Sequence, residues 1–93
     1  MNAVVVYDNI KDKELLDKID LGVPFFIDYI DVNTVKGKKE AFKVKSHWGA
    51  KLDPFIELYD DESKISKVFY SEKQNAVNQL ISYLNENFNK KIA

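Results

Sequence analysis

The chain has 93 residues, 45% of them hydrophobic, and a formal net charge of -1. That is enough for one compact core, too little for two domains, and no global field favours a nucleic acid or a membrane. The chain contains no cysteine and its 14 strongly basic residues are all lysines, so disulfides, thiolate metal ligands, thiol nucleophiles and arginine-based phosphate sites are excluded.

The same composition limits the organisation and the location of the protein. We expect a single domain over residues 1–93, since no repeat, low-complexity tract or linker interrupts the chain. The first residues lack a basic segment, and the apolar run over residues 3–7 is too short for a signal peptide or a membrane span. We therefore expect a cytoplasmic protein with no membrane partner.

Abundant lysine, asparagine and isoleucine without arginine suggest an AT-rich genome, bacterial or phage.

The first half of the chain predicts two strands and two helices in alternation. Residues 4–7 form a continuous β-branched and aromatic run, which is typical of a central strand covered on both faces. Asn9 can cap a short amphipathic helix that ends near Gly22. Residues 25–32 predict a strand close to an edge of the sheet, and the lysine-rich residues 34–48 have the apolar spacing of a second helix.

The second half predicts a hairpin followed by a helix. Residues 54–59 and 64–70 are strand-like and flank a polar turn over residues 60–63, which indicates a β-hairpin with a four-residue loop. Ser71, with Gln74 three residues later, has the spacing of a capping box for the last helix. The apolar stripe of that helix is predicted to consist of Val77, Leu80, Ile81, Leu84 and Phe88.

The predicted order is β-α-β-α-β-β-α, an α/β fold with a four-stranded mixed sheet and helices on both faces. This is the order of the thioredoxin core, and residues 25–88 resemble thioredoxins. Residues 30–33 are similar to the second core strand of that family. Residues 48–55 are similar to its aromatic-glycine pair, followed at the same spacing by its cis-proline, here Pro54, and an apolar strand.

The chain departs from the thioredoxin-like superfamily at the first helix. In the family a Cys-x-x-Cys motif begins this helix, where the helix dipole lowers the thiol pKa. The corresponding turn here is Asp8, Asn9, Ile10 and Lys11, which offers no nucleophile toward sulfur. The resemblance therefore implies the scaffold without its redox chemistry.

The resemblance also implies a surface that can hold a protein segment. If Pro54 is cis, the backbone around Asp53 is exposed and can pair with an extended partner strand. The alternative is that Pro54 merely begins a strand, where proline is tolerated. The predicted partner-binding residues are Asp8, Asn9, Lys11, Trp48, Asp53 and Pro54.

Trp48 and the lysines of the second helix each have two interpretations. Trp48 can be an interface aromatic, or it can pack the end of the helix onto the sheet, which we favour. The lysines can contact nucleic-acid phosphates or form a solvated helix face, and the lack of arginine favours the second. These lysines are Lys36, Lys38, Lys39, Lys43, Lys45 and Lys51.

No catalytic residue, metal site or cofactor cradle is predicted. His47 is the only histidine and is expected on the surface, and the acidic residues 60–62 are explained by the turn. The sequence favours a non-redox protein-binding module, such as a phage or low-GC bacterial modulator of a host protein. The alternatives are a glutathione- or small-ligand-binding domain like the glutaredoxins and, less favoured, a nucleic-acid binder with a basic helix.

Overall fold

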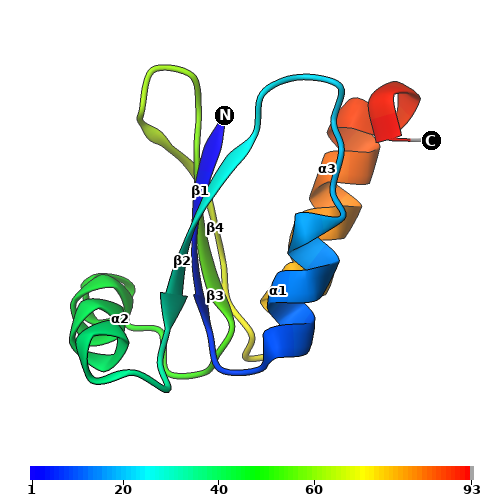
Figure 1. Cartoon of the computed structure of the whole chain (residues 1–93). Helices are drawn as coiled ribbons and strands as arrows, with labels where there is room; N and C mark the ends of the chain where they lie inside the picture. The colour runs from blue at the N-terminus through cyan, green and yellow to red at the C-terminus, as the bar shows by residue number, and fades with distance from the viewer. Residues whose placement is uncertain (93) are drawn as a thin grey trace.

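The computed structural model describes the backbone of residues 1–92 and the side chains of residues 1–87. It is an α/β fold with a four-stranded mixed sheet and three helices, in the predicted order (Figure 1). The elements are β1 (Asn2–Tyr7), α1 (Ile10–Asp17), β2 (Phe26–Asp31), α2 (Val35–Trp48), β3 (Phe55–Tyr59), β4 (Ile65–Phe69) and α3 (Ala76–Ile92).

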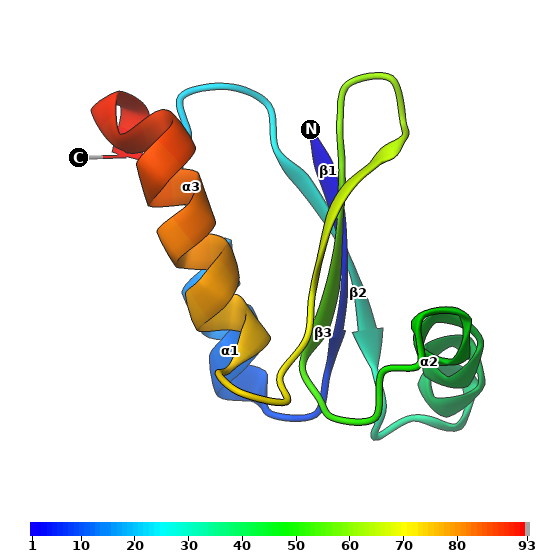
Figure 2. The same ribbon diagram turned by 180° about the vertical axis from the view of Figure 1, so that it is seen from behind.

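The strands lie in the order β2-β1-β3-β4, so β1 is central. It pairs in parallel with β2 and antiparallel with β3, and β3 pairs antiparallel with β4. Helices α1 and α3 cover one face of the sheet and α2 lies against the other, as the two opposite views show (Figures 1 and 2). The central position predicted for β1 and the edge position predicted for β2 are both confirmed.

Each face of the sheet has its own apolar core. On the face of α1 and α3, Val5, Ile56 and Leu80 are fully buried. On the face of α2, Val6 and Phe55 are fully buried as well. Alternate residues of β1 thus enter opposite cores, which is why this strand is apolar without interruption. Burial of each such side chain contributes roughly 1.5–3 kcal/mol.

The start of the first helix follows the predicted signal, whereas α1 ends at Asp17, before the predicted stop near Gly22. The Asn9 side chain accepts a hydrogen bond from the N–H of Lys11, at 3.0 Å, and caps α1. Thr34 caps α2 by accepting from the N–H of Gly37, at 2.9 Å. Gly49 ends α2 with a φ of 67°, a left-handed conformation that favours glycine.

The start of the last helix differs from the prediction. Helix α3 begins at Ala76, and Oδ1 of Asn75 accepts a hydrogen bond from the N–H of Val77 at 2.8 Å. The predicted capping box of Ser71 and Gln74 is therefore wrong. The reason is local competition, because Asn75 stands directly before the helix and is itself a strong capping residue.

The hairpin and the apolar stripe of α3 agree with the sequence pattern. The loop over residues 60–63 is closed by a hydrogen bond from the N–H of Asp60 to the carbonyl oxygen of Lys64, at 2.9 Å. Leu80 and Leu84 of the stripe are buried. The side chain of Phe88, predicted for the same stripe, lies outside the described residues.

Gly37 permits a close approach between α2 and the end of β2. A Cβ atom there would lie 1.8 Å from the carbonyl oxygen of Asp31. We expect Gly37→Ala to lower the free energy of unfolding by roughly 1–3 kcal/mol or more because of this overlap. Helix propensity alone would raise the free energy of unfolding by about 1 kcal/mol. Urea unfolding followed by circular dichroism shows whether the substitution raises or lowers this free energy.

Ser46 supplies the matched control, because it is exposed on the same helix. Ser46→Ala should stay within about 0.5 kcal/mol of the wild type. A Gly37→Ala protein as stable as the wild type would contradict the close approach.

Candidate functional site

The pairing of β1 with β3 brings two loops to one end of the sheet. Val6 pairs with Phe55 in the antiparallel ladder, so the chain leaving β1 and the chain entering β3 run side by side. Residues 8–11 and 52–54 therefore lie at the same end, which is the lower end of the sheet in Figure 1. We call these two segments together the loop edge.

The turn into α1 is fixed through its backbone. Nδ2 of Asn33 donates a hydrogen bond to the carbonyl oxygen of Asp8 at 2.9 Å, which ties the turn to the segment after β2. The Asn9 side chain is occupied as the cap of α1. The side chains of Asp8 and Lys11 are exposed. They are the two charged groups of this turn that can contact a partner.

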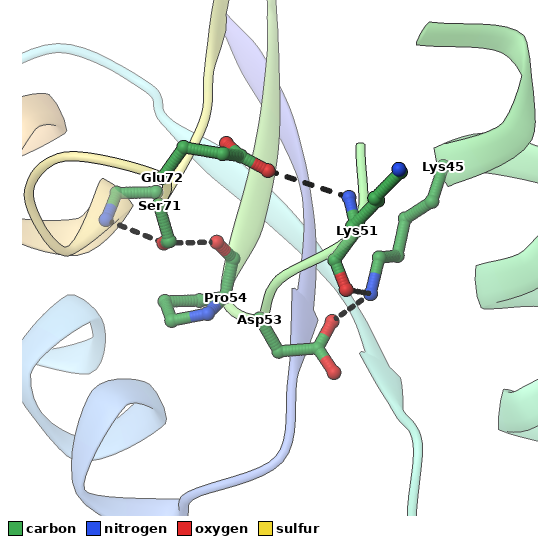
Figure 3. A network of polar contacts seen from close by, with 7 residues as sticks. Lys45, Lys51, Asp53, Pro54, Ser71 and Glu72 are labelled. Atoms are coloured by element: carbon green, nitrogen blue, oxygen red, sulfur yellow. Dashed lines mark hydrogen bonds and ion pairs between the residues drawn. The ribbon is translucent and has the colours of Figure 1, made fainter. Parts of the chain in front are cut away.

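The loop that enters β3 is held from both sides, as Figure 3 shows. The peptide bond between Asp53 and Pro54 is cis. This agrees with the interpretation of Pro54 as the cis-proline of the resemblance. From α2, Nζ of Lys45 forms an ion pair with Oδ1 of Asp53 at 2.7 Å and donates to the carbonyl oxygen of Lys51 at 3.4 Å. From the other side, the hydroxyl of Ser71 donates to the carbonyl oxygen of Pro54.

This ion pair is shielded from solvent. The Lys45 and Asp53 side chains are only 15% and 19% exposed. A partly buried pair of this kind is weakened less by salt than a surface pair, so it holds the loop against α2 more firmly. The loop conformation is thus set before any partner binds.

The main chain at Asp53 has no hydrogen-bond partner among the described residues, in contrast to its side chain. Among the hydrogen bonds of the residues that the structure describes, none engages the backbone N–H or the C=O of Asp53. Backbone groups without an internal partner, in a segment that is held in place, are what an added peptide strand requires.

Two exposed apolar side chains at the loop edge were not identified from the sequence. Ile10 is 56% exposed at the start of α1, and Leu52 is 49% exposed next to Asp53. Ile10 could have been found, since it stands between Asn9 and Lys11 in the turn that the sequence already singled out. Leu52 gave no local signal, because its exposure depends on how the loop is anchored.

Trp48 lies apart from the loop edge. Its indole packs with the core on the α2 face, and its Nε1 donates to Oε2 of Glu57 at 2.6 Å. Glu57 is buried in β3 and also accepts from the hydroxyl of Tyr59, at 3.1 Å. Burial and this hydrogen bond raise the pKa of Tyr59. These contacts are the ones expected if Trp48 packs the end of α2 onto the sheet. The exposed ring of His47 lies edge-on against the Trp48 ring.

The structure therefore brings together five of the six predicted residues. Asp8, Asn9, Lys11, Asp53 and Pro54 lie on the two segments of the loop edge. Trp48 instead lies over the sheet, with its polar atom already satisfied by Glu57.

Asp12 stands behind the loop edge and faces inward. Nδ2 of Asn75 donates to its carboxylate at 3.4 Å, which links α1 to the start of α3. Burial raises the pKa of Asp12, the hydrogen bond from Asn75 opposes this, and nearby Asp8 adds to it. Folding thus disfavours the charged form of Asp12.

Two cavities flank the loop before β3. One of about 420 Å³ lies between α2 and the loop and reaches Asp53. The other, of about 600 Å³, lies on the opposite side of Lys51, between Gly49 and the segment that leads into α3. A hydrogen bond of 3.4 Å from the N–H of Lys51 to Glu72 spans that second side.

Other kinds of site find no support in the part of the chain that the structure describes. There, no three histidine, cysteine or acidic side chains gather closely enough to hold a metal ion. None of the helices in that part has the length and apolar character needed to span a membrane.

Comparison of the chain with protein-family models, with curated proteins and with solved structures finds no match.

The contact between Trp48 and Glu57 makes Trp48→Phe a test of structural role. Phenylalanine removes the indole donor and leaves the buried carboxylate of Glu57 with fewer partners. We expect the free energy of unfolding to fall by about 1–3 kcal/mol. Urea unfolding followed by circular dichroism measures it.

His47→Phe is the control for this substitution, since His47 is the exposed neighbour of Trp48. It should change the free energy of unfolding by less than about 0.5 kcal/mol. Unchanged stability of Trp48→Phe would argue for an interface role instead.

Proposed function

We propose that this chain is a non-catalytic protein-binding module of thioredoxin-like fold, which grips an extended segment of a partner at the loop edge. The element order and the residues around Pro54 support the fold assignment. The absence of cysteine from the whole sequence supports a binding role, because exchange of disulfides needs a thiolate.

The observation that carries the proposal is the free backbone of Asp53 in a loop anchored on both sides. The side chain of Asp53 is held by Lys45, and the carbonyl oxygen of Pro54 is held by Ser71. The N–H and C=O of Asp53 are left for a partner strand. Because the loop is already ordered, little conformational entropy is lost when the partner binds.

The apolar side chains beside this backbone supply the contact area that hydrogen bonds alone lack. Ile10 and Leu52 lie on the two segments of the loop edge, and both are about half exposed. An extended peptide places alternate side chains on opposite sides, so one set can pack on these residues while its main chain pairs with Asp53. The role at this edge is therefore recognition of a segment and not chemistry upon it.

Selection from a random peptide library displayed on phage tests the proposal. The wild-type protein should retain peptides well above a blank support. The double variant Ile10→Ser/Leu52→Ser should retain at least about tenfold fewer, because two small polar side chains replace the apolar contact area without a change in net charge.

The matched control is Val23→Ser/Ile65→Ser, which changes two apolar residues of similar exposure far from the loop edge. This variant should retain peptides as the wild type does, and circular dichroism should show all three proteins folded. No retention by the wild type, or an equal loss in the control variant, contradicts the proposed function.

A further inference from the structure

The cavity between α2 and the loop before β3 continues directly from the loop edge. Its volume is about 420 Å³, and Asp53 forms one end of its lining. Val32, Ala41 and Ala50 supply apolar walls, while Lys38 and Lys51 stand at its sides. We call this cavity the helix groove. A chain paired with Asp53 would therefore lie at one end of the helix groove.

The helix groove has an excess of positive charge. Lys45 is neutralised by Asp53, and Lys36 lies 3.9 Å from Glu40, the one carboxylate of α2. Within the described residues, no carboxylate lies within ion-pair distance of Lys38 or Lys51. Lys39 and Lys43, on the same helix, are two more lysines for which the described residues show no ion pair. The neighbourhood therefore attracts an anionic partner.

The groove also presents apolar surface to solvent. Phe42, which lines it, is 73% exposed, and Val35, seven residues earlier on the same helix, is 75% exposed. Residues seven apart lie on one face of a helix, and Lys38 and Lys39 stand between these two, so Val35 and Phe42 are separate apolar side chains among the lysines. A large aromatic that is this exposed favours a partner with an apolar side chain.

Peptide chemistry fits this surface better than nucleic acid. The helix has one exposed phenylalanine, Phe42, whereas stacking of successive bases needs several aromatic rings. The open backbone of Asp53 pairs with a peptide main chain and has no counterpart in a nucleic acid.

We infer that the helix groove receives an acidic segment of a partner protein, with carboxylates that face Lys38 and Lys51 and an apolar side chain that packs on Phe42. This inference rests on the proposed function, since the same segment pairs with Asp53. It names the chemistry of the partner, which the loop edge alone leaves open.

The composition of the peptides selected from the random library tests the inference. Peptides retained by the wild type should be enriched in aspartate and glutamate next to an aliphatic or aromatic residue. A synthetic copy of the most enriched peptide should bind at least about tenfold more weakly to Lys38→Glu/Lys51→Glu, because two attractive contacts become repulsive. Fluorescence anisotropy of the labelled peptide measures the affinity.

The control variant Lys18→Glu/Lys64→Glu makes the same change in net charge at exposed positions away from the groove. Its affinity for the peptide should lie within about twofold of the wild type, which separates local contact from long-range attraction. Phe42→Ser should reduce binding of the acidic peptide and leave the fold intact, since this side chain is mostly exposed.

Each contrary outcome identifies what is wrong. If peptides are retained but show no acidic preference, or both charge-reversal variants weaken binding equally, this inference fails and the proposed function stands. If the wild type retains no peptide, both fail. Tighter binding of a single-stranded oligothymidine than of the peptide would assign the groove to nucleic acid, and self-association in light scattering would assign it to a second copy.

Discussion

The antiparallel pairing of β1 with β3 is the constraint on which the candidate site depends. The register of Val6 opposite Phe55 sets where both strands end, and therefore where the turn into α1 meets the loop before β3. It also distributes β1 between two cores, with Val5 under α1 and α3 and Val6 under α2. A shift of one residue would exchange these faces and separate the loops, so the apolar run of β1 maintains the loop edge as well as the core.

The loop before β3 combines a fixed shape with an open backbone. Lys45 holds it from α2 and Ser71 holds it from the segment before α3, so both layers of helices determine its position. Neither contact uses the N–H or C=O of Asp53. The arrangement suits recognition, because a preordered segment binds an extended peptide at a lower entropic cost. Because Asp53 pairs with Lys45, Lys38 and Lys51 are the lysines of the helix groove without an ion pair. The contact that holds the loop therefore also sets the positive charge of the groove.

The sequence predicted the elements well wherever the signal was local. The cap of α1 depends on Asn9 and the hairpin depends on its turn, and both were predicted from neighbouring residues, whereas the cap of α2 at Thr34 was not predicted. The start of α3 was misplaced because two capping candidates stood within five residues of each other. The site was predicted only in part, since the exposure of Leu52 and the contact between Trp48 and Glu57 arise from residues distant in sequence. No spacing pattern reports such contacts.

The most direct test of the account is a nuclear magnetic resonance titration of the isotope-labelled protein with the acidic peptide that it selects. The account predicts that the backbone amide of Asp53 shifts most strongly, since it gains a hydrogen-bond partner, and that the amides of Ile10, Leu52 and Lys51 shift with it. Amides of β4 and α3 should change little. If the largest shifts instead lie on β4 or α3, or the amide of Asp53 is unaffected at saturation, the loop edge is not the binding surface and the central claim is wrong.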